Sequence, residues 1–449
     1  MGYVKFALNL VLSLRYAGVE NYVVVALDEQ AFQFFQKRNV STFLYGVNSS
    51  GNGSTAALHH ASPEFMDIMH LRLQALIGLL ESGLHVWFTD ADAVFNMDPF
   101  HFLSKDMYQA ELCYDTPFLP RERGGPLMVM AGFFFMRSCR IHPTNCVLLR
   151  ETGRRQRARP ERHDQVALNE ALAAHPEIEY RLLDPLLFPN GAVFFADRAP
   201  QNFGIKAVVV QNNHMTGAAS KRHRFREHLL WFLDPPSYYM APPRRAALLV
   251  YEGGVPAVLG LRWEFAALRA AFALGRMLGR TVVLPLLCLY HAAPGLYQGS
   301  SDWCTLEEYA APPDAWVLPY REHALSMHPT TPTALRHAIQ HAPIRSLLGA
   351  RQQDARGSRR KVVRERDVVA AFGCHGCHEG DVGEDECQEV LRLGPLWDWE
   401  VIFDSEERQT QFDTDWNQQI RLREEISRHV TSTVAELGAG FVCVHGWDG

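Results

Sequence analysis

Hydrophobic periodicity divides the first half of the chain into alternating helices and strands. Apolar residues recur at helical spacing over residues 64–81 and 164–174, so both segments are predicted to be amphipathic helices. Shorter apolar runs predict buried strands at residues 21–27, 84–89 and 129–136. This alternation favours an α/β fold in which helices cover a mostly parallel sheet.

A proline-rich segment, DPPSYYMAPPRR, separates the two halves of the chain. It spans residues 234–245 and has the composition of a linker. Beyond it, residues 261–278 predict an amphipathic helix and residues 281–284 a strand. We therefore expect a first domain at residues 1–233, a linker at 234–246 and a second α/β domain at 247–449.

Both ends of the chain depart from the usual pattern of an α/β domain. The chain opens on a helix-like segment, whereas such domains normally open on a strand. It closes on a buried-strand pattern, residues 441–444, with five residues after it. We expect an N-terminal anchor and a first strand to precede the chain, and the second domain to be incomplete.

Composition narrows the class of protein. With 449 residues, 47% hydrophobic and 21% charged, the chain is neither disordered nor collagenous, and it can bury substantial cores. The formal net charge of −6 gives no general attraction to nucleic acid. No apolar stretch reaches the roughly 18 residues of a membrane span. The arginine-rich run at residues 150–162 reads as a solvated loop, and phosphate binding is its alternative role.

Cysteines and glycosylation sequons favour the secretory lumen. The nine cysteines are too sparse to define a disulfide framework, and their odd number leaves at least one unpaired. Sequons for N-glycosylation begin at Asn39, Asn48 and Asn52. The cluster Cys374, Cys377 and Cys387 includes a haem-attachment pattern and could bind zinc, but a local disulfide or free thiols are the simpler interpretation.

The segment WFTDADAVFNMDPF carries the clearest chemical signal. A buried strand runs directly into Asp90-Ala-Asp92, and ligand sites of open α/β sheets lie at the carboxyl ends of strands. Two carboxylates at that place can hold a divalent cation that bridges a diphosphate and stabilises its charge as it leaves. The structural alternative is that both aspartates cap the next element.

Two further segments carry polar groups suited to the same chemistry. Asp164 and Gln165 begin a predicted helix, where Asp164 either caps the helix or faces, with Gln165, a reacting sugar. After the strand at 207–210, His214 could be a third metal ligand, with Gly217 and Lys221 on a phosphate. The alternative for this last segment is a strand and capped helix with surface side chains.

Together these motifs resemble the GT-A nucleotide-sugar transferases, and in particular glycosyltransferase family 77 of plants and algae. The resemblance covers roughly residues 6–232. The stretches that carry it are NLVLSLRYAGVENYVVVALD, FTDADAVFNMDPF, AGFFFMRS, HDQVALNEAL, FPNGAVFF and NNHMTGAASKRHRFREHLLW. Residues 263–290, with Trp303 and Cys304, resemble the C-terminal extension of the extensin arabinosyltransferases of that family, which is similar to the opening of a fucosyltransferase-like fold.

The resemblance implies a retaining, manganese-dependent transfer from a UDP-sugar in the Golgi lumen. The donated sugar would be arabinose or another pentose, and the acceptor a hydroxyproline-rich glycoprotein or a cell-wall glycan. Members of the family are type II membrane proteins, although this chain contains no anchor. The implied roles are Asp90, Asp92 and His214 on the metal, Asn213, Gly217 and Lys221 on the nucleotide sugar, and Asp164 and Gln165 as catalytic residues.

One position departs from the family pattern. Family members often carry histidine where this chain has Gln211. Either His214 takes over the metal role or metal binding is weakened. The rival hypothesis is therefore a catalytically weak glycosyltransferase-like protein that binds a glycan or a partner. A metal or redox protein built on the cysteines at 374–387 is a third class.

Overall fold

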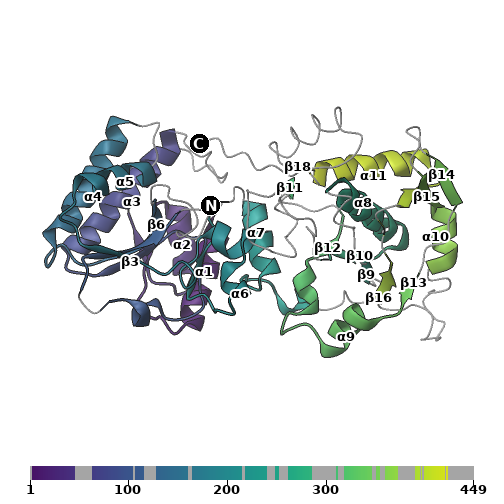
Figure 1. The fold of residues 1–449 in the computed structure, drawn as a ribbon, viewed down its shortest axis with the longest axis horizontal. Helices are drawn as coiled ribbons and strands as arrows, with labels where there is room; N and C mark the ends of the chain where they lie inside the picture. The colour runs from purple at the N-terminus through teal and green to yellow at the C-terminus, as the bar shows by residue number, and fades with distance from the viewer. Residues whose placement is uncertain are drawn as a thin grey trace. The chain divides into compact units, whose positions relative to one another are not determined.

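The computed structural model describes residues 3–45, 63–104, 107–115, 128–159, 164–214, 218–239, 248–251, 261–285, 310–311, 318–345, 350–353, 359–372, 390–394, 396, 399–419 and 421–422. The chain divides into two compact units, Met1–Ala218 and Ala219–Gly449 (Figure 1). The domain boundary at residue 233 and the linker at 234–246 stay predictions. The Cys374, Cys377 and Cys387 cluster and the sequons at Asn48 and Asn52 lie outside the described residues.

A four-stranded sheet in the order β3-β6-β5-β7 organises the first unit. Two short strand pairs, β1–β2 and β4–β8, accompany it. The strands are β1 (Val24–Ala26), β2 (Thr42–Leu44), β3 (Val86–Thr89), β4 (Ala93–Phe95), β5 (Ala110–Tyr114), β6 (Val129–Met136), β7 (Tyr180–Leu182) and β8 (Val209–Gln211). The helices are α1 (Val4–Tyr16), α2 (Glu29–Gln36), α3 (Pro63–Glu81), η1 (Pro99–Phe102), α4 (Pro143–Ala158), α5 (Asp164–Ala174), η2 (Ala192–Ala196) and α6 (Ala199–Asn202).

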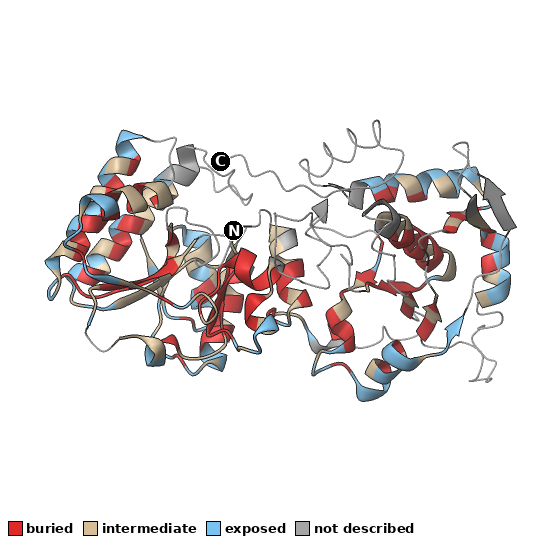
Figure 2. Cartoon of the chain, in the orientation of Figure 1, coloured by how far each residue is buried: buried red, intermediate tan, exposed pale blue. Residues whose placement is uncertain are grey.

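Helices α3, α4 and α5 lie together on one side of this sheet (Figure 1). Their apolar faces and the strands form one buried cluster that includes Leu76, Leu80, Phe134, Leu149 and Leu168. The buried positions follow the inward faces of the helices, with exposed positions on the outer side (Figure 2). This packing fixes where α3 and α5 present their polar residues.

The mixed α/β class is confirmed, but the expectation of a mostly parallel sheet is wrong for the first unit. Strand β6 is antiparallel to both β3 and β5, and of the three pairings in the four-stranded sheet only β5 with β7 is parallel. Apolar periodicity predicts burial and carries no information on strand direction. The predicted helix at residues 164–174 and the predicted strand at 129–136 are both confirmed.

The arginine-rich run also differs from the prediction of a loop, because residues 143–158 form α4. Arginine has a high helix propensity, and Glu151 forms ion pairs with Arg154 and Arg155 within the helix. Arg150 forms an ion pair with Glu81 of α3. These ion pairs therefore stabilise α4 and attach it to α3.

Parallel strands do appear in the second unit. Its five-stranded sheet, β12-β10-β9-β16-β13, is parallel throughout. The unit also contains the three-stranded sheet β14-β15-β17 and the pair β11–β18. The strands are β9 (Leu248–Tyr251), β10 (Thr281–Val283), β11 (Ala310–Ala311), β12 (Tyr320–Arg321), β13 (Ile344–Arg345), β14 (Ala350–Gln353), β15 (Arg359–Arg364), β16 (Val390–Leu393), β17 (Trp399–Ile402) and β18 (Arg421–Leu422).

Helix α8 (Leu261–Leu278) supplies much of the second core, with Phe272 and Leu274 fully buried. It coincides with the predicted helix at residues 261–278. The remaining helices are α7 (Ala218–Glu227), η3 (Pro236–Tyr239), η6 (His323–Ser326), α9 (Thr333–His341), α10 (Glu365–Phe372) and α11 (Glu406–Gln419).

Buried polar side chains fasten α7 inside the second unit. Arg226 forms an ion pair with Asp234 at 2.5 Å, and the Tyr238 hydroxyl donates to Glu322 at 2.6 Å. His223 stacks on the Tyr320 ring and lies 2.8 Å from its hydroxyl. Burial, reinforced by neighbouring arginines, lowers the pKa of His223 to about 3, so this imidazole is neutral in the folded protein.

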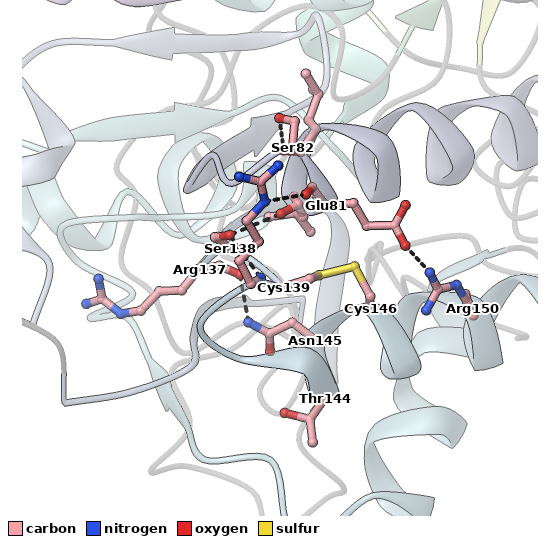
Figure 3. The surroundings of a disulfide bond; sticks show 12 residues. Glu81, Ser82, Arg137, Ser138, Cys139, Thr144, Asn145, Cys146 and Arg150 are labelled. Carbon is pink, nitrogen blue, oxygen red and sulfur yellow. Dashed lines mark hydrogen bonds and ion pairs between the residues drawn. A yellow bond between two sulfur atoms is a disulfide. The ribbon is translucent and has the colours of Figure 1, made fainter.

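One disulfide is present among the described residues. Cys139, just after β6, is bonded to Cys146 in α4, and Figure 3 shows Arg150 reaching Glu81 beside it. Cys113 is a buried free thiol, and burial raises its pKa well above the ordinary value, which keeps it protonated. No described helix combines the length and the apolar character that a bilayer span requires.

Candidate functional site

Asp90 follows the last residue of β3 and is fitted closely against β6. Its backbone N–H donates to the Gly132 carbonyl oxygen at 2.8 Å. A Cβ atom at Gly132 would stand 2.1 Å from Asp90 Oδ2, so glycine lets this carboxylate keep its present position. Gly132 was not predicted from the sequence, although a glycine inside the apolar strand VMAGFFFM is the usual sign of a close approach.

Arg72 of α3 joins two of the predicted carboxylates. Its Nη1 atom donates to Asp90 Oδ1 at 2.5 Å, and its Nη2 atom donates to Asp164 Oδ2. We call these three residues the Arg72 cluster. The exposed fractions of the side chains are 14% for Arg72, 37% for Asp90 and 8% for Asp164. Asp164 is thus an ion-pair partner, and Asp90 retains a surface open to a ligand.

The Arg72 guanidinium stays charged in this setting. Burial opposes its charge, but Asp164 and Asp90 outweigh that effect and raise the pKa of Arg72 above its ordinary value. The sequence analysis missed this residue as well. Its signal is the position of an arginine on the apolar face of the helix, level with Ile68 and Leu76.

Asp92 lies in a different environment, between β4 and β8. The two strands pair so that Ala93 is opposite Gln211, and the Asn212 N–H donates to the Asp92 carbonyl oxygen at 3.0 Å. The Gln211 Nε2 atom donates to Asp92 Oδ1 at 3.3 Å. Asp92 is 6% exposed and Gln211 2%. The Gln211 Oε1 atom is buried without a hydrogen-bond partner.

A third carboxylate, Asp115, brings together residues from two predicted motifs. It follows β5 and accepts hydrogen bonds from Asn213 Nδ2 at 2.7 Å and from Gln165 Nε2. The His214 Nε2 atom lies 3.4 Å from Asp115 Oδ1. We call these four residues the Asp115 cluster. The sequence analysis missed Asp115, whose signal is another apolar strand, AELCY, that runs directly into an aspartate.

The segment after β8 is held in place by close contacts between Asn213 and Gly191. The Gly191 N–H donates to Asn213 Oδ1 at 2.6 Å, and a Cβ atom at Gly191 would lie 2.0 Å from the Asn213 carbonyl oxygen. His214 has a left-handed backbone with φ 54°.

Helix α5 is held against β6 by Asn169. Its side chain exchanges hydrogen bonds with the backbone N–H and the carbonyl oxygen of Val129.

Not all of the predicted site residues are brought together. Gly217 lies outside the described residues, and Lys221 lies on α7 in the second unit. In the part of the chain that the structure describes, no three His, Cys, Asp or Glu side chains form a metal-binding group. The set of Asp90, Asp92 and His214 as metal ligands therefore stays a prediction.

The side chains at these strand ends nevertheless fit a divalent cation. Among the described residues, the Arg72 cluster, Asp92 and Asp115 together hold four carboxylates and one guanidinium, a formal excess of three negative charges. A diphosphate would be repelled by this excess unless a cation accompanied it. The unpartnered amide oxygen of Gln211 beside the Asp92 carboxylate offers the oxygen ligands that hard divalent cations take.

Residues 17–225 match the family model described as nucleotide-diphospho-sugar transferase. A UDP-D-xylose:L-fucose alpha-1,3-D-xylosyltransferase of Arabidopsis thaliana is 31% identical, over 42% of this chain and 59% of that protein. A UDP-galactose:fucoside alpha-3-galactosyltransferase of Dictyostelium discoideum is 24% identical, over 52% of this chain and 42% of that protein. Arabinosyltransferase XEG113 of Arabidopsis thaliana is 23% identical, over 66% of this chain and 51% of that protein. The chain thus spans less than two thirds of each of these relatives.

Proposed function

Starting from the nucleotide-diphospho-sugar transferase domain that the chain carries over residues 17–225, we propose that it transfers a pentose from a UDP-sugar to a cell-wall glycan or glycoprotein. The transfer retains the anomeric configuration of the sugar and requires a divalent metal, either manganese or another divalent cation. The observation that carries this proposal is the position of Asp90 and Asp92 at the carboxyl end of β3 inside the matched domain.

The donor would be held by the residues around these two aspartates. Asp92 would lie on the cation, which would neutralise the diphosphate as it departs. Asn213, Gly217 and Lys221 would contact the nucleotide sugar, and Asp90 would contact it from the Arg72 cluster. The excess of carboxylates at the strand ends supports a cation-dependent donor site, because it disfavours a bare diphosphate.

Retention is supported by the names of the relatives. Two of them are named for alpha-linked products, from UDP-xylose and from UDP-galactose. Both of these donors carry the sugar in the α configuration, so an α product keeps it. We propose attack from the front face, in which the departing diphosphate takes the proton of the acceptor hydroxyl.

Asp164 and Gln165 have separate parts in this proposal. Arg72 holds the Asp164 carboxylate, which leaves Asp164 to shape the sugar side through charge rather than as a free nucleophile. Gln165 donates to Asp115, and this contact would place its amide against the anomeric carbon as positive charge develops there. Both residues would then stabilise the oxocarbenium-like state.

The identity of the sugar and of the acceptor is drawn from the relatives. Xylose and arabinose are pentoses and appear in two of the names, and fucose or a fucoside is the acceptor in two. A fucosylated glycan is therefore the first acceptor to test, and a hydroxyproline-rich peptide the second. The disulfide and the exposed sequon at Asn39 support the Golgi lumen as the compartment.

The test is a transfer assay with the purified chain and manganese. UDP-xylose, UDP-arabinofuranose and UDP-galactose would each be offered with a methyl fucoside and with a hydroxyproline oligopeptide, and proton NMR would give the configuration of any product. We expect a pentose product that keeps the anomeric configuration of its donor, α in the case of UDP-xylose, and that Asp92→Asn abolishes. Metal-dependent UDP binding without transfer from any donor would contradict the proposal and favour a glycan-binding role. A product whose anomeric configuration is opposite to that of its donor would overturn retention.

A further inference from the structure

The Gln211 side chain is fixed in one orientation beside Asp92. Its Nε2 atom donates to the carboxylate, so a flipped amide would set two oxygens against each other. The orientation leaves Oε1 without a hydrogen-bond partner on a residue that is 2% exposed. A buried acceptor without a hydrogen-bond partner destabilises the fold, and such a cost is expected where the atom serves a ligand.

The surroundings indicate what kind of ligand that is. Among the described residues, the carboxylates at these strand ends exceed the guanidinium by three formal charges, so a cation is favoured there over a neutral donor. A cation would also serve the Asp92 carboxylate, next to which the amide lies. The His214 Nε2 atom lies on the side of Asp115, 3.4 Å from its Oδ1 atom, whereas the Gln211 amide lies directly against Asp92.

We propose that Gln211, through Oε1, is a ligand of the divalent cation held by Asp92, in the place first predicted for His214. This inference rests on the proposed function, because the cation is the one that accompanies the UDP-sugar. The protein ligands are then all oxygen atoms. Imidazole favours transition metals, whereas carboxylate and amide oxygens accept magnesium and manganese alike. The chain should therefore use magnesium about as well as manganese.

Calorimetric titration of UDP into the full chain tests this inference, in saturating Mg²⁺, in saturating Mn²⁺ and in EDTA. Wild type is expected to bind UDP with similar affinity in both metals and not to bind it in EDTA. Gln211→Met keeps the side-chain size but removes the oxygen, and it should weaken binding in both metals by about tenfold or more. Gln211→His should restore binding in Mn²⁺ while leaving Mg²⁺ about tenfold weaker.

His214→Phe and Gln211→Glu are the matched controls. The first should leave the ratio of Mg²⁺ to Mn²⁺ affinities unchanged. The second keeps an oxygen ligand but places a carboxylate beside Asp92, so its melting temperature should rise more on adding Mg²⁺ with UDP than that of wild type. This readout applies even if Gln211→Met folds poorly.

The outcomes separate the inference from the function on which it rests. If wild type binds no UDP in either metal, the proposed function fails, and the inference fails with it. If wild type binds but Gln211→Met binds equally well, only the inference is overturned. A wild-type preference for Mn²⁺ that His214→Phe abolishes would return the ligand role to His214 and would also overturn the inference.

Discussion

The surroundings of Asp90 and Asp92 differ in charge, although only one residue separates the two. Asp90 is paired with the Arg72 guanidinium, so the protein itself compensates its charge. Asp92 accepts a hydrogen bond from the neutral amide of Gln211. The two aspartates of one motif thus have different neighbours, a guanidinium for Asp90 and a neutral amide for Asp92. We propose that Asp90 orders the site together with Arg72 and that Asp92 binds the cation.

Removing the charge of Arg72, which compensates Asp90 and Asp164, should have the largest effect on stability. Arg72→Met leaves the Asp164 carboxylate, 8% exposed, without its cation, and breaking such a buried pair costs about 3–5 kcal/mol. Denaturation in urea would measure the loss of unfolding free energy. Asp164→Asn in the Arg72→Met background should recover part of it. A loss below about 1 kcal/mol would show that the Arg72 cluster does not order the site.

Displacing Asp90 without changing any charge should lower the unfolding free energy by less. Gly132→Ala introduces a Cβ atom 2.1 Å from Asp90 Oδ2, so the carboxylate must leave its place beside Arg72. We expect up to about 3 kcal/mol of destabilisation, the usual range for overpacking. Metal-dependent UDP binding should weaken while the Asp92–Gln211 contact persists. Ala131→Gly in the same strand is the control, and unchanged stability in Gly132→Ala would contradict the close fit.

A substitution distant from both aspartates tests whether a loss of stability alone weakens UDP binding. Cys139→Ala removes the disulfide to Cys146, whose short loop predicts a cost of about 2.5 kcal/mol. The melting temperature should fall, but UDP affinity measured well below it should equal that of wild type. Loss of UDP binding in the folded variant would mean that binding reports general stability, and the comparison between Asp90 and Asp92 would lose its meaning.

Acid should produce a smaller effect, and it acts on the second unit. The pKa of His223 is lowered from 6.5 to about 3 by burial and by Arg226 and Arg222, so below pH 6.5 the unfolded chain binds a proton that the folded chain does not. Stability from this group is complete above pH 6.5 and falls as the pH decreases toward 3. From pH 6.5 to about pH 5 the loss is about 2 kcal/mol.

His223→Gln isolates that contribution. The variant keeps an acceptor for the Tyr320 hydroxyl but does not titrate, so its stability should decline less steeply on acidification than that of wild type. Parallel acid profiles of the two proteins would contradict the assignment. Comparisons of Asp90 and Asp92 variants are accordingly best made above pH 6.5, where this group contributes no slope.

Local patterns predicted those features that depend on neighbours in sequence. Helices α5 and α8 and strand β6 coincide with their predicted bounds, because an apolar face or a continuous apolar run specifies each. The position of Asp90 and Asp92 just after β3 was also predictable, since a buried strand followed by two aspartates is a local pattern. The antiparallel pairing of β6 was not, because burial is the same in either strand direction.

Residues whose role depends on distant partners could not be identified in this way. The role of Arg72 depends on its contact with Asp164, which is 92 residues away in the sequence. The role of Asp115 likewise depends on its contacts with Asn213 and Gln165. The Gln211 substitution reads as a defect in the sequence. Its contact with Asp92 and its unpartnered oxygen are the basis for proposing it as a cation ligand.

The most direct measurement compares UDP binding by Asp90→Asn and Asp92→Asn, by calorimetry with manganese and with EDTA. If Asp92 directs its charge to the cation, Asp92→Asn abolishes metal-dependent binding and keeps the melting temperature of wild type. Asp90→Asn should bind UDP with at most about tenfold lower affinity, since its charge serves the Arg72 cluster. Equal loss of binding in both variants would contradict the division of roles. Unchanged binding in Asp92→Asn would contradict the metal assignment itself.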